Sequence, residues 1–150
     1  MKKVLIVDDE PLITAKAKEL LEELDLHIFV AEDGQQGLDV LDQNPDIDCV
    51  VSDIKMPVMD GIEFIKNVRS RDNDVPFIFY TGHGDDKLIM EAVKYGAFDF
   101  VGKPDFSNLI ESVSTGLERG FQLKEKESLF SKDVKNLLDE YDSLKSLLDE

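Results

Sequence analysis

The chain has 150 residues, of which 42% are hydrophobic, so it is long enough for one globular domain with a short appendage. Its formal net charge of −16 argues against a nucleic-acid-binding surface, which needs clustered Lys and Arg to displace counterions. No apolar stretch approaches the roughly 20 residues that span a bilayer, and the opening MKKVLIVDDEP turns acidic too soon for a signal peptide. We therefore expect a cytoplasmic protein.

Short apolar runs alternate with helical patterns along most of the chain. The runs are rich in β-branched and aromatic residues, as strands are, and lie at Lys3 to Val7, His27 to Ala31, Cys49 to Ser52, Pro76 to Tyr80 and Phe98 to Val101. Pro11 is a favoured first helical residue, and Asp33 and Asp60 stand in capping positions. This alternation predicts an α/β fold, a doubly wound five-stranded parallel sheet with helices on both faces.

Two residues in these runs carry reactive side chains, and both are expected to be structural. Cys49 is the only cysteine, which excludes an internal disulfide, and its apolar neighbours indicate a core thiol rather than a nucleophile. His27 lies in the second run and is likewise assigned to the framework.

Three aspartates follow two of the predicted strands. Asp8 and Asp9 come directly after the first run, and Asp53 directly after the third. If these strands are neighbours, the carboxylates converge, and like charges about 4 Å apart repel by roughly 1 to 4 kcal/mol per pair, which favours a bound cation. Oxygen ligands without His or Cys favour Mg²⁺ over zinc. The alternative is that these acids are solvated loop residues, although Asp60 is better placed than Asp53 to cap the next helix.

A hydroxyl and an ammonium group reach the same predicted edge. Thr81 follows the fourth run and can donate a hydrogen bond to an anion, and Lys103 follows the fifth run and supplies a compact positive charge. A carboxylate nucleophile, a divalent metal, a hydroxyl and a lysine are the groups that phosphoryl transfer uses. Taken singly, such a Thr or Lys is more often an ordinary turn or surface residue.

The order of these residues resembles the receiver domain of two-component response regulators. The resemblance is carried by Asp8-Asp9, Asp53, Thr81 and Lys103-Pro104. It covers about residues 2 to 119, and it implies a flavodoxin-like sheet with the strand order 2-1-3-4-5.

The resemblance also implies a role for each acid. Asp53 would be the phosphoacceptor, which takes a phosphoryl group from the phosphohistidine of a sensor histidine kinase or phosphotransfer protein. Asp9 and Asp53 would bind Mg²⁺ directly, Asp8 would act through water, and the backbone carbonyl of Lys55 would complete the protein's ligands.

The remaining motif positions would bind the phosphoryl group and respond to it. Thr81 would bind one phosphoryl oxygen and Lys103 another, while Phe100 matches the aromatic switch of the family, here without a phenolic hydroxyl. Lys55 and His83 lie two residues after the phosphoacceptor and two after Thr81, where side chains tune phosphoryl hydrolysis. The alternative is that both are solvated loop residues.

Residues 121 to 150 lie outside the resemblance and carry a heptad pattern. Spacings of four and three connect Phe130, Val134, Leu137, Tyr141, Leu144 and Leu148. The same register reaches back to Leu109, so the last receiver helix is expected to continue into the tail, although Gly116 and Gly120 weaken it and could bend it. The pattern predicts a helical extension that self-associates, docks on a partner or packs back on the receiver.

The sequence thus predicts a receiver domain at residues 1 to 120 and a helical extension, a coiled coil or linker, at residues 121 to 150. The expected function is that of a phosphorylated signalling domain, not an enzyme, although it would assist its own phosphorylation and dephosphorylation. Its partners would be a kinase, a downstream protein and a second copy through residues 121 to 150, with neither nucleic acid nor membrane. The alternatives are a receiver fragment of a longer regulator or hybrid kinase and an aspartyl-phosphate phosphatase, whose usual second Asp is here Lys55.

Overall fold

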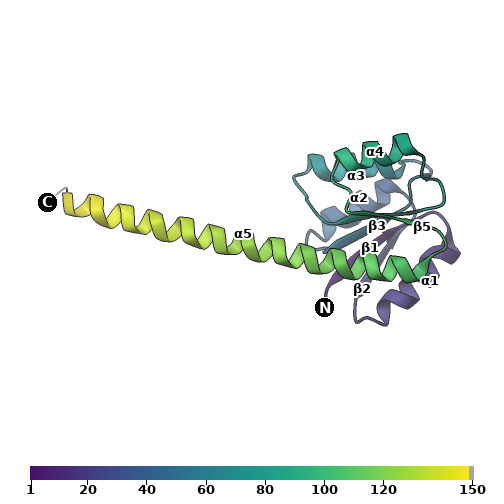
Figure 1. The fold of residues 1–150 in the computed structure, drawn as a ribbon, viewed down its shortest axis with the longest axis horizontal. Coiled ribbons are helices and arrows are strands. Elements are labelled where there is room, and N and C mark those ends of the chain that lie inside the picture. The colour runs from purple at the N-terminus through teal and green to yellow at the C-terminus, as the bar shows by residue number, and fades with distance from the viewer. Residues whose placement is uncertain (149–150) are drawn as a thin grey trace. The chain divides into compact units, whose positions relative to one another are not determined.

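The computed structural model describes residues 1–148 and contains one five-stranded parallel sheet (Figure 1). The strands are β1 (Lys3–Val7), β2 (His27–Ala31), β3 (Cys49–Ser52), β4 (Phe77–Thr81) and β5 (Asp99–Gly102). The helices are α1 (Pro11–Glu22), α2 (Gly34–Gln43), α3 (Gly61–Ser70), α4 (Asp86–Lys94) and α5 (Phe106–Leu148). The strand order is β2-β1-β3-β4-β5 and every neighbouring pair is parallel. The predicted doubly wound fold is confirmed.

Helices cover both faces of the sheet, and each face has its own apolar layer (Figure 1). On one face, α2, α3 and α4 contribute Leu38, Phe64 and Ala92. On the other face, α1 contributes Leu21 and the first turns of α5 contribute Leu109. Burial on both faces explains why the central strands are continuously apolar rather than alternating.

The lone cysteine and the histidine of β2 are part of this framework. Cys49 is fully buried, and burial raises the pKa of its thiol to about 12, which makes it a poor nucleophile at neutral pH. The His27 ring stacks on the ring of Phe29, with 4.4 Å between their centroids. These surroundings agree with the structural roles expected for both residues.

Acidic caps start four of the helices. Asp33, Asp60, Asp85 and Asp105 each accept a hydrogen bond from the backbone N–H three residues further on, which satisfies one of the free donors at a helix start. The first two caps were expected from the sequence. Helix α1 begins at Pro11, whose fixed φ suits the first turn, and has no side-chain cap.

Strands β4 and β5 both lie one residue further along the chain than predicted. β4 begins after Pro76, which has no N–H to donate to a neighbouring strand. β4 ends at Thr81 and β5 at Gly102, and these two residues pair with each other. The shift leaves Lys103 as the first residue beyond the sheet, beside the end of β4.

One arginine joins the end of α4 to the end of α3. The Arg69 guanidinium donates hydrogen bonds to four backbone carbonyls, those of Tyr95 at 2.7 Å, Asn73 at 2.8 Å, Val75 at 2.9 Å and Gly96 at 3.1 Å. Two of these carbonyls follow α3 and two follow α4. The guanidinium therefore holds the C-terminal end of α4 in place. The compact ammonium group of a lysine could not reach all four carbonyls.

The loop between β3 and α3 contains a strained residue. Val58 has a φ of 67°, a left-handed conformation that β-branched residues rarely adopt, and it is 84% exposed. The N–H of Met59 donates to the carbonyl of Pro57 at 2.7 Å, so the chain makes a tight three-residue turn here. The sequence analysis did not foresee this turn.

Replacing Val58 by Gly is expected to stabilise the protein by about 0.5 to 1 kcal/mol, because relief of the strain exceeds the extra entropy of Gly in the unfolded chain. Chemical denaturation would show a higher midpoint with an unchanged slope. Val58→Ala is the control, since it removes the branch but keeps a Cβ in the same conformation. A lower midpoint for Val58→Gly than for Val58→Ala would contradict the assignment of strain.

Helix α5 continues without a break from the sheet-covering part into the tail. It runs through Gly116 and Gly120, so these residues do not end it. The chain divides into two compact units, Met1–Glu118 and Arg119–Glu150. In the second unit the exposed hydrophobic residues are Phe121, Leu123, Leu129, Phe130, Val134, Leu137, Leu138, Tyr141, Leu144 and Leu147. The side chain of Leu148 and residues 149–150 lie outside the described part.

No helix within residues 1–148 combines the length and the apolar character needed to cross a lipid bilayer.

Candidate functional site

The carboxyl ends of β1 and β3 place two aspartates next to each other. Val7 of β1 pairs with Ser52 of β3, so Asp8 and Asp53 are the next residues of two adjacent strands. Both are buried, with exposures of 4% and 2%. Asp53 Oδ1 accepts a hydrogen bond from the next backbone N–H at 2.7 Å, which orients the carboxylate. The sequence predicts that Asp8, Asp9 and Asp53 converge if the two strands are neighbours, and in the structure Asp8 and Asp53 do so, while Asp9 is not in the converging group.

Lys103 lies against both aspartates. Its Nζ is 2.7 Å from Asp8 Oδ2 and 2.7 Å from Asp53 Oδ2, and its side chain is only 10% exposed. The backbone N–H of Lys103 donates to the carbonyl of Thr81 at 3.1 Å, which ties the lysine to the end of β4. A carboxylate, a second carboxylate and an ammonium group from three different loops therefore meet at one point.

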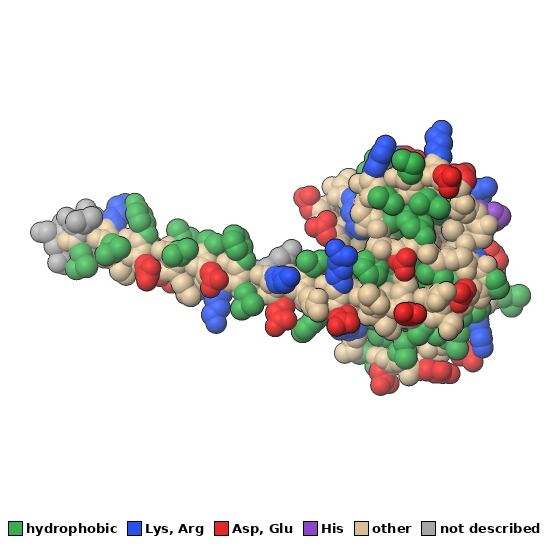
Figure 2. Space-filling model, viewed as in Figure 1, with side chains coloured by type: hydrophobic (Ala, Val, Ile, Leu, Met, Phe, Trp, Pro, Cys, Tyr) green, Lys and Arg blue, Asp and Glu red, His purple; other side chains and the backbone are tan. Residues whose placement is uncertain are grey.

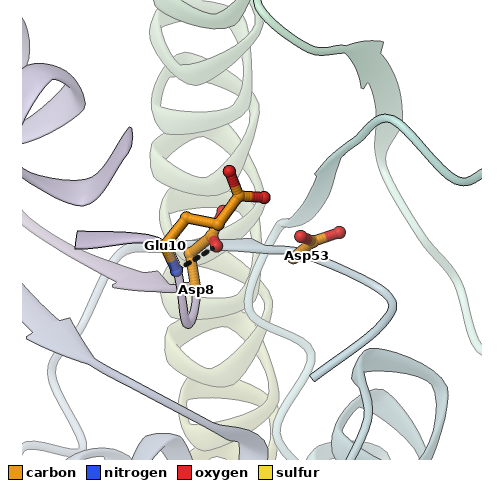
Figure 3. Close-up of side chains that lie close together, drawn as sticks. All are labelled: Asp8, Glu10 and Asp53. Atoms are coloured by element: carbon orange, nitrogen blue, oxygen red, sulfur yellow. Dashed lines mark hydrogen bonds between the residues drawn. The ribbon is translucent and has the colours of Figure 1, made fainter. Parts of the chain in front are cut away.

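A third carboxylate, that of Glu10, joins this group. Glu10 Oε1 is 2.9 Å from Lys103 Nζ, and one carboxylate oxygen from each of Asp8, Glu10 and Asp53 lies within 4.8 Å of the other two (Figure 3). The sequence analysis missed Glu10. Its acidic type and its position after Asp8-Asp9 were visible, but its reach toward Lys103 depends on the turn between β1 and α1.

Burial and ion pairing set the charges of the site. Burial raises the pKa of Asp8 above its ordinary value, and the bonds from Lys103 and the Glu10 N–H only partly offset this effect. Burial alone would lower the pKa of Lys103, but its hydrogen bonds to Asp53, Asp8 and Glu10 raise it. Lys103 is therefore charged at neutral pH, and three acids share one positive charge.

Asp9 lies apart from the buried group. It is exposed, and it is not one of the three carboxylates that converge within the described part of the chain. Lys55 and His83 are also exposed, on the loops after β3 and β4. Their assigned roles as a metal ligand and as tuning residues stay predictions.

Thr81 and Phe100 lie on the neighbouring strands at the same edge of the sheet. Thr81 is 7% exposed, and its Oγ1 accepts a hydrogen bond from the backbone N–H of His83 at 3.1 Å. Phe100 on β5 is partly buried and stacks on Phe79 of β4, with 5.5 Å between centroids and 15° between ring planes. The hydroxyl and the aromatic ring therefore lie on paired strands, and Lys103 follows the second of these strands directly.

Gly61 explains the Asp-Gly pair that follows Asp53 in the sequence. Its N–H donates to the carbonyl of Ile54 at 2.7 Å, and a Cβ at this position would collide with the carbonyl oxygen of Asp53. Only Gly allows the start of α3 to approach the loop after β3 this closely.

The chain matches a protein-family model. The model for the response regulator receiver domain covers residues 4–114, which include Asp8, Asp53, Thr81 and Lys103. DctD of Pseudomonas aeruginosa, a C4-dicarboxylate transport transcriptional regulatory protein, is 38% identical over 116 residues, which are 77% of this chain and 25% of that protein. The transcriptional regulatory protein FixJ of Bradyrhizobium diazoefficiens is 37% identical over 101 residues, which are 67% of this chain and 49% of that protein.

These relatives bear on the expected absence of a nucleic-acid partner. Both are named as transcriptional regulatory proteins, as is CpxR of Escherichia coli, which is 38% identical over 104 residues, 69% of this chain and 44% of that protein. The expectation that nucleic acid plays no part is therefore not supported. The chain spans a quarter to about half the length of these relatives, and the net charge of a receiver carries no information on what the rest of a longer regulator binds.

Solved structures agree with the family model. A receiver domain protein from Clostridium thermocellum superposes with a TM-score of 0.76 at 30% identity, over 82% of this chain and 99% of that one. The receiver domain of the Francisella response regulator 1452 gives a TM-score of 0.72 at 31% identity, over 79% and 98%. On its fold, its sequence and the residues at the sheet edge, the chain belongs to the response regulator receiver domain family.

Proposed function

We propose that Asp53 accepts a phosphoryl group from the phosphohistidine of a sensor histidine kinase or phosphotransfer protein. The observation that carries this proposal is the bond from Lys103 to both Asp53 and Asp8 at a buried sheet edge. In the transfer, an Asp53 oxygen forms a bond to phosphorus as the phosphorus–nitrogen bond breaks. The electron pair of that bond stays on the imidazole, which then takes up a proton. Lys103 and the Thr81 hydroxyl would each bind an oxygen of the transferred group.

The acidic site fits a magnesium ion. The converging donors are the carboxylates of Asp8, Glu10 and Asp53, the ligand type that Mg²⁺ prefers, and they outnumber the single lysine. Asp9, Asp53 and the Lys55 carbonyl would hold the ion, with Asp8 acting through water. When bound, Mg²⁺ would neutralise the carboxylates and the incoming phosphoryl oxygens.

Labelling with a small phosphodonor tests this function. We expect acetyl phosphate with Mg²⁺ to add one phosphate to the chain, observed as a single mass increment by intact-mass spectrometry. Excess chelator should abolish the increment, because three carboxylates without a metal repel an anionic donor. Equal labelling with and without chelator would contradict the role of the metal.

The rival function is an aspartyl-phosphate phosphatase acting on small molecules. Such an enzyme needs a general acid two residues after the nucleophile, and Lys55 at that position is exposed and carries no carboxyl group. Steady-state hydrolysis of a generic phosphate ester would favour this alternative if its turnover rate were much higher than the rate at which the phosphorylated chain loses its phosphate.

We also propose that phosphorylation changes a protein-binding surface through Thr81 and Phe100. Thr81 would move toward the phosphoryl oxygen, and Phe100 would turn inward into the space that Thr81 leaves. A ligand shifts an equilibrium only by contacting the two states differently, and the contact between Thr81 and the phosphoryl oxygen would be that difference. Phe100 is suited to this role because it is only partly buried and packs on β4. The downstream partner would bind α4, β5 and the start of α5.

The expected result is a set of NMR shift changes within residues 82 to 110 when a phosphoryl mimic and Mg²⁺ are added. Thr81→Ala should weaken these changes while the mimic still binds near Asp53. Shift changes that leave residues 82 to 110 untouched and appear elsewhere would contradict the switch.

The tail supports a further proposal, that residues 121 to 150 pair with a second copy of the chain. Figure 2 shows hydrophobic side chains exposed along this segment among charged ones. An apolar heptad seam on a lone helix is unfavourable in water, so it needs a cover. In a parallel, in-register pair, the seam would bring Glu140 of one helix next to Lys145 of the other, five residues further on, where opposite charges favour this register.

A further inference from the structure

Glu10 has an unusual position at the start of α1. It is the capping residue of that helix, yet its side chain forms no capping bond. Its backbone is fixed on both sides, because its N–H donates to Asp8 Oδ1 at 2.9 Å and its carbonyl accepts from the N–H of Ile13 and of Thr14, each at 3.1 Å. The side chain is thus free of the usual task of a cap and extends to Lys103 from a rigid turn.

Three carboxylates surround the ammonium group of Lys103. A lysine ammonium carries three N–H donors, and Lys103 Nζ has three carboxylate partners, Asp8 and Asp53 at 2.7 Å and Glu10 at 2.9 Å. A phosphoryl oxygen can bind Lys103 only after one of these partners has released it. The identity of that partner follows from burial.

The three carboxylates differ in what release would cost them. The side chains of Asp8 and Asp53 are 3% and 2% exposed, so a carboxylate left without Lys103 would be unpaired in the interior. The Glu10 side chain is 55% exposed, so water can replace the lysine at once. Glu10 is the partner that Lys103 can lose most easily.

We infer that Glu10 is a positioning residue that occupies, in the resting protein, the Lys103 donor that an incoming phosphoryl oxygen takes. The phosphoryl group must displace the Glu10 carboxylate into solvent, and the negative charge of Glu10 also opposes the anionic donor. Glu10 thereby sets a threshold against adventitious phosphorylation by small phosphodonors. This inference rests on the proposed phosphoryl transfer to Asp53.

Three variants separate displacement from a general effect of charge. Glu10→Gln removes the charge. Glu10→Asp keeps it but shortens the side chain, and Asp at this position favours capping the N–H groups of α1 over reaching Lys103. Glu32→Gln is the matched control, because it removes one exposed negative charge from the loop after β2, at the same edge of the sheet, and leaves the three Lys103 partners in place.

The test measures the rate of labelling by acetyl phosphate at saturating Mg²⁺ as a function of donor concentration. Both Glu10 variants should need about three- to tenfold less donor for half-maximal rate, and Glu32→Gln should match the parent chain. Equal donor dependence in Glu10→Gln and the parent, or an equal effect of Glu32→Gln, would overturn the inference. A result in which Glu10→Asp behaves like the parent chain would also overturn it, because charge rather than occupancy would then be responsible.

A second measurement does not depend on covalent transfer. Inorganic phosphate titrated against the parent chain and the variants, with the amide shifts of Thr81 and Lys103 followed by NMR, should show half-saturation at about three- to tenfold lower concentration in both Glu10 variants. Half-saturation at the same concentration in all four proteins would overturn the inference. If the variants bind phosphate more tightly but acetyl phosphate labels none of the proteins, the inference on Glu10 stands and the proposed function fails.

Discussion

Replacing Asp53 by Asn is expected to abolish phosphorylation of the chain by acetyl phosphate or by a phosphohistidine donor. Asn keeps the size of the side chain but lacks an ionised oxygen that can attack phosphorus. The other acids that contact Lys103, Asp8 and Glu10, are not expected to substitute, because Asp8 is buried between Lys103 and its own backbone contacts and the Glu10 side chain is largely in solvent. Intact-mass measurement should show one added phosphate on the parent chain and none on Asp53→Asn.

The matched control for this variant is Asp60→Asn. Asp60 lies seven residues further on, at the capping position of α3, and Asn can accept the same hydrogen bond from the N–H of Glu63. This variant should be labelled like the parent chain. One phosphate added to Asp53→Asn at the parent rate would show that another residue is the phosphoacceptor.

The second large effect is expected in the tail, where replacing Leu137 and Leu144 by Glu should convert a self-associated protein to a monomer. Both residues lie on the heptad seam and are more than 60% exposed within the described chain, so another copy is free to cover them. Burying two glutamates in that interface would cost several kcal/mol, more than a short coiled coil provides. Light scattering at micromolar concentration should report a dimer or larger for the parent chain and a monomer for the double variant.

Asn136→Glu with Ser143→Glu is the control for added charge. These residues precede the two leucines by one position each and lie off the seam, so this variant should remain associated. All of these proteins should still accept phosphate at Asp53. A parent chain that is monomeric at this concentration, with a protease-sensitive tail, would contradict self-association through residues 121 to 150.

Much of the fold was predictable because hydrophobic periodicity and local signals agree. The five apolar runs became the five strands, and the acids Asp33 and Asp60 became caps. The positions of Asp8 and Asp53 after two predicted strands implied their convergence only if these strands are neighbours, and that order was implied by the resemblance to receiver domains; the structure pairs β1 with β3. The predicted ends of β4 and β5 differ from the observed ends by one residue, because the hydrophobic pattern does not show which backbone N–H and carbonyl groups pair.

What the sequence did not reveal depends on side-chain reach and on backbone conformation in loops. The contact between Glu10 and Lys103 joins residues 93 positions apart and arises only once the turn after β1 has formed. The left-handed conformation of Val58 was likewise hidden, because nothing in its side chain favours such a turn. Asp9 is a candidate ligand by its sequence position and is exposed in the fold, and its role as a metal ligand stays a prediction.

The four hydrogen bonds from Arg69 to backbone carbonyls attach the C-terminal end of α4 to the end of α3. The guanidinium bonds to the carbonyls of Tyr95 and Gly96 fix the C-terminal end of α4, so a rotation of the helix would leave that end in place. Nine residues of α-helix are about 13 Å long, so a rotation of about 10° would displace the opposite end, near Asp86, by about 2 Å while Tyr95 stays in place. A rotation of this kind would therefore displace the residues just after β4 most and the residues bonded to Arg69 least.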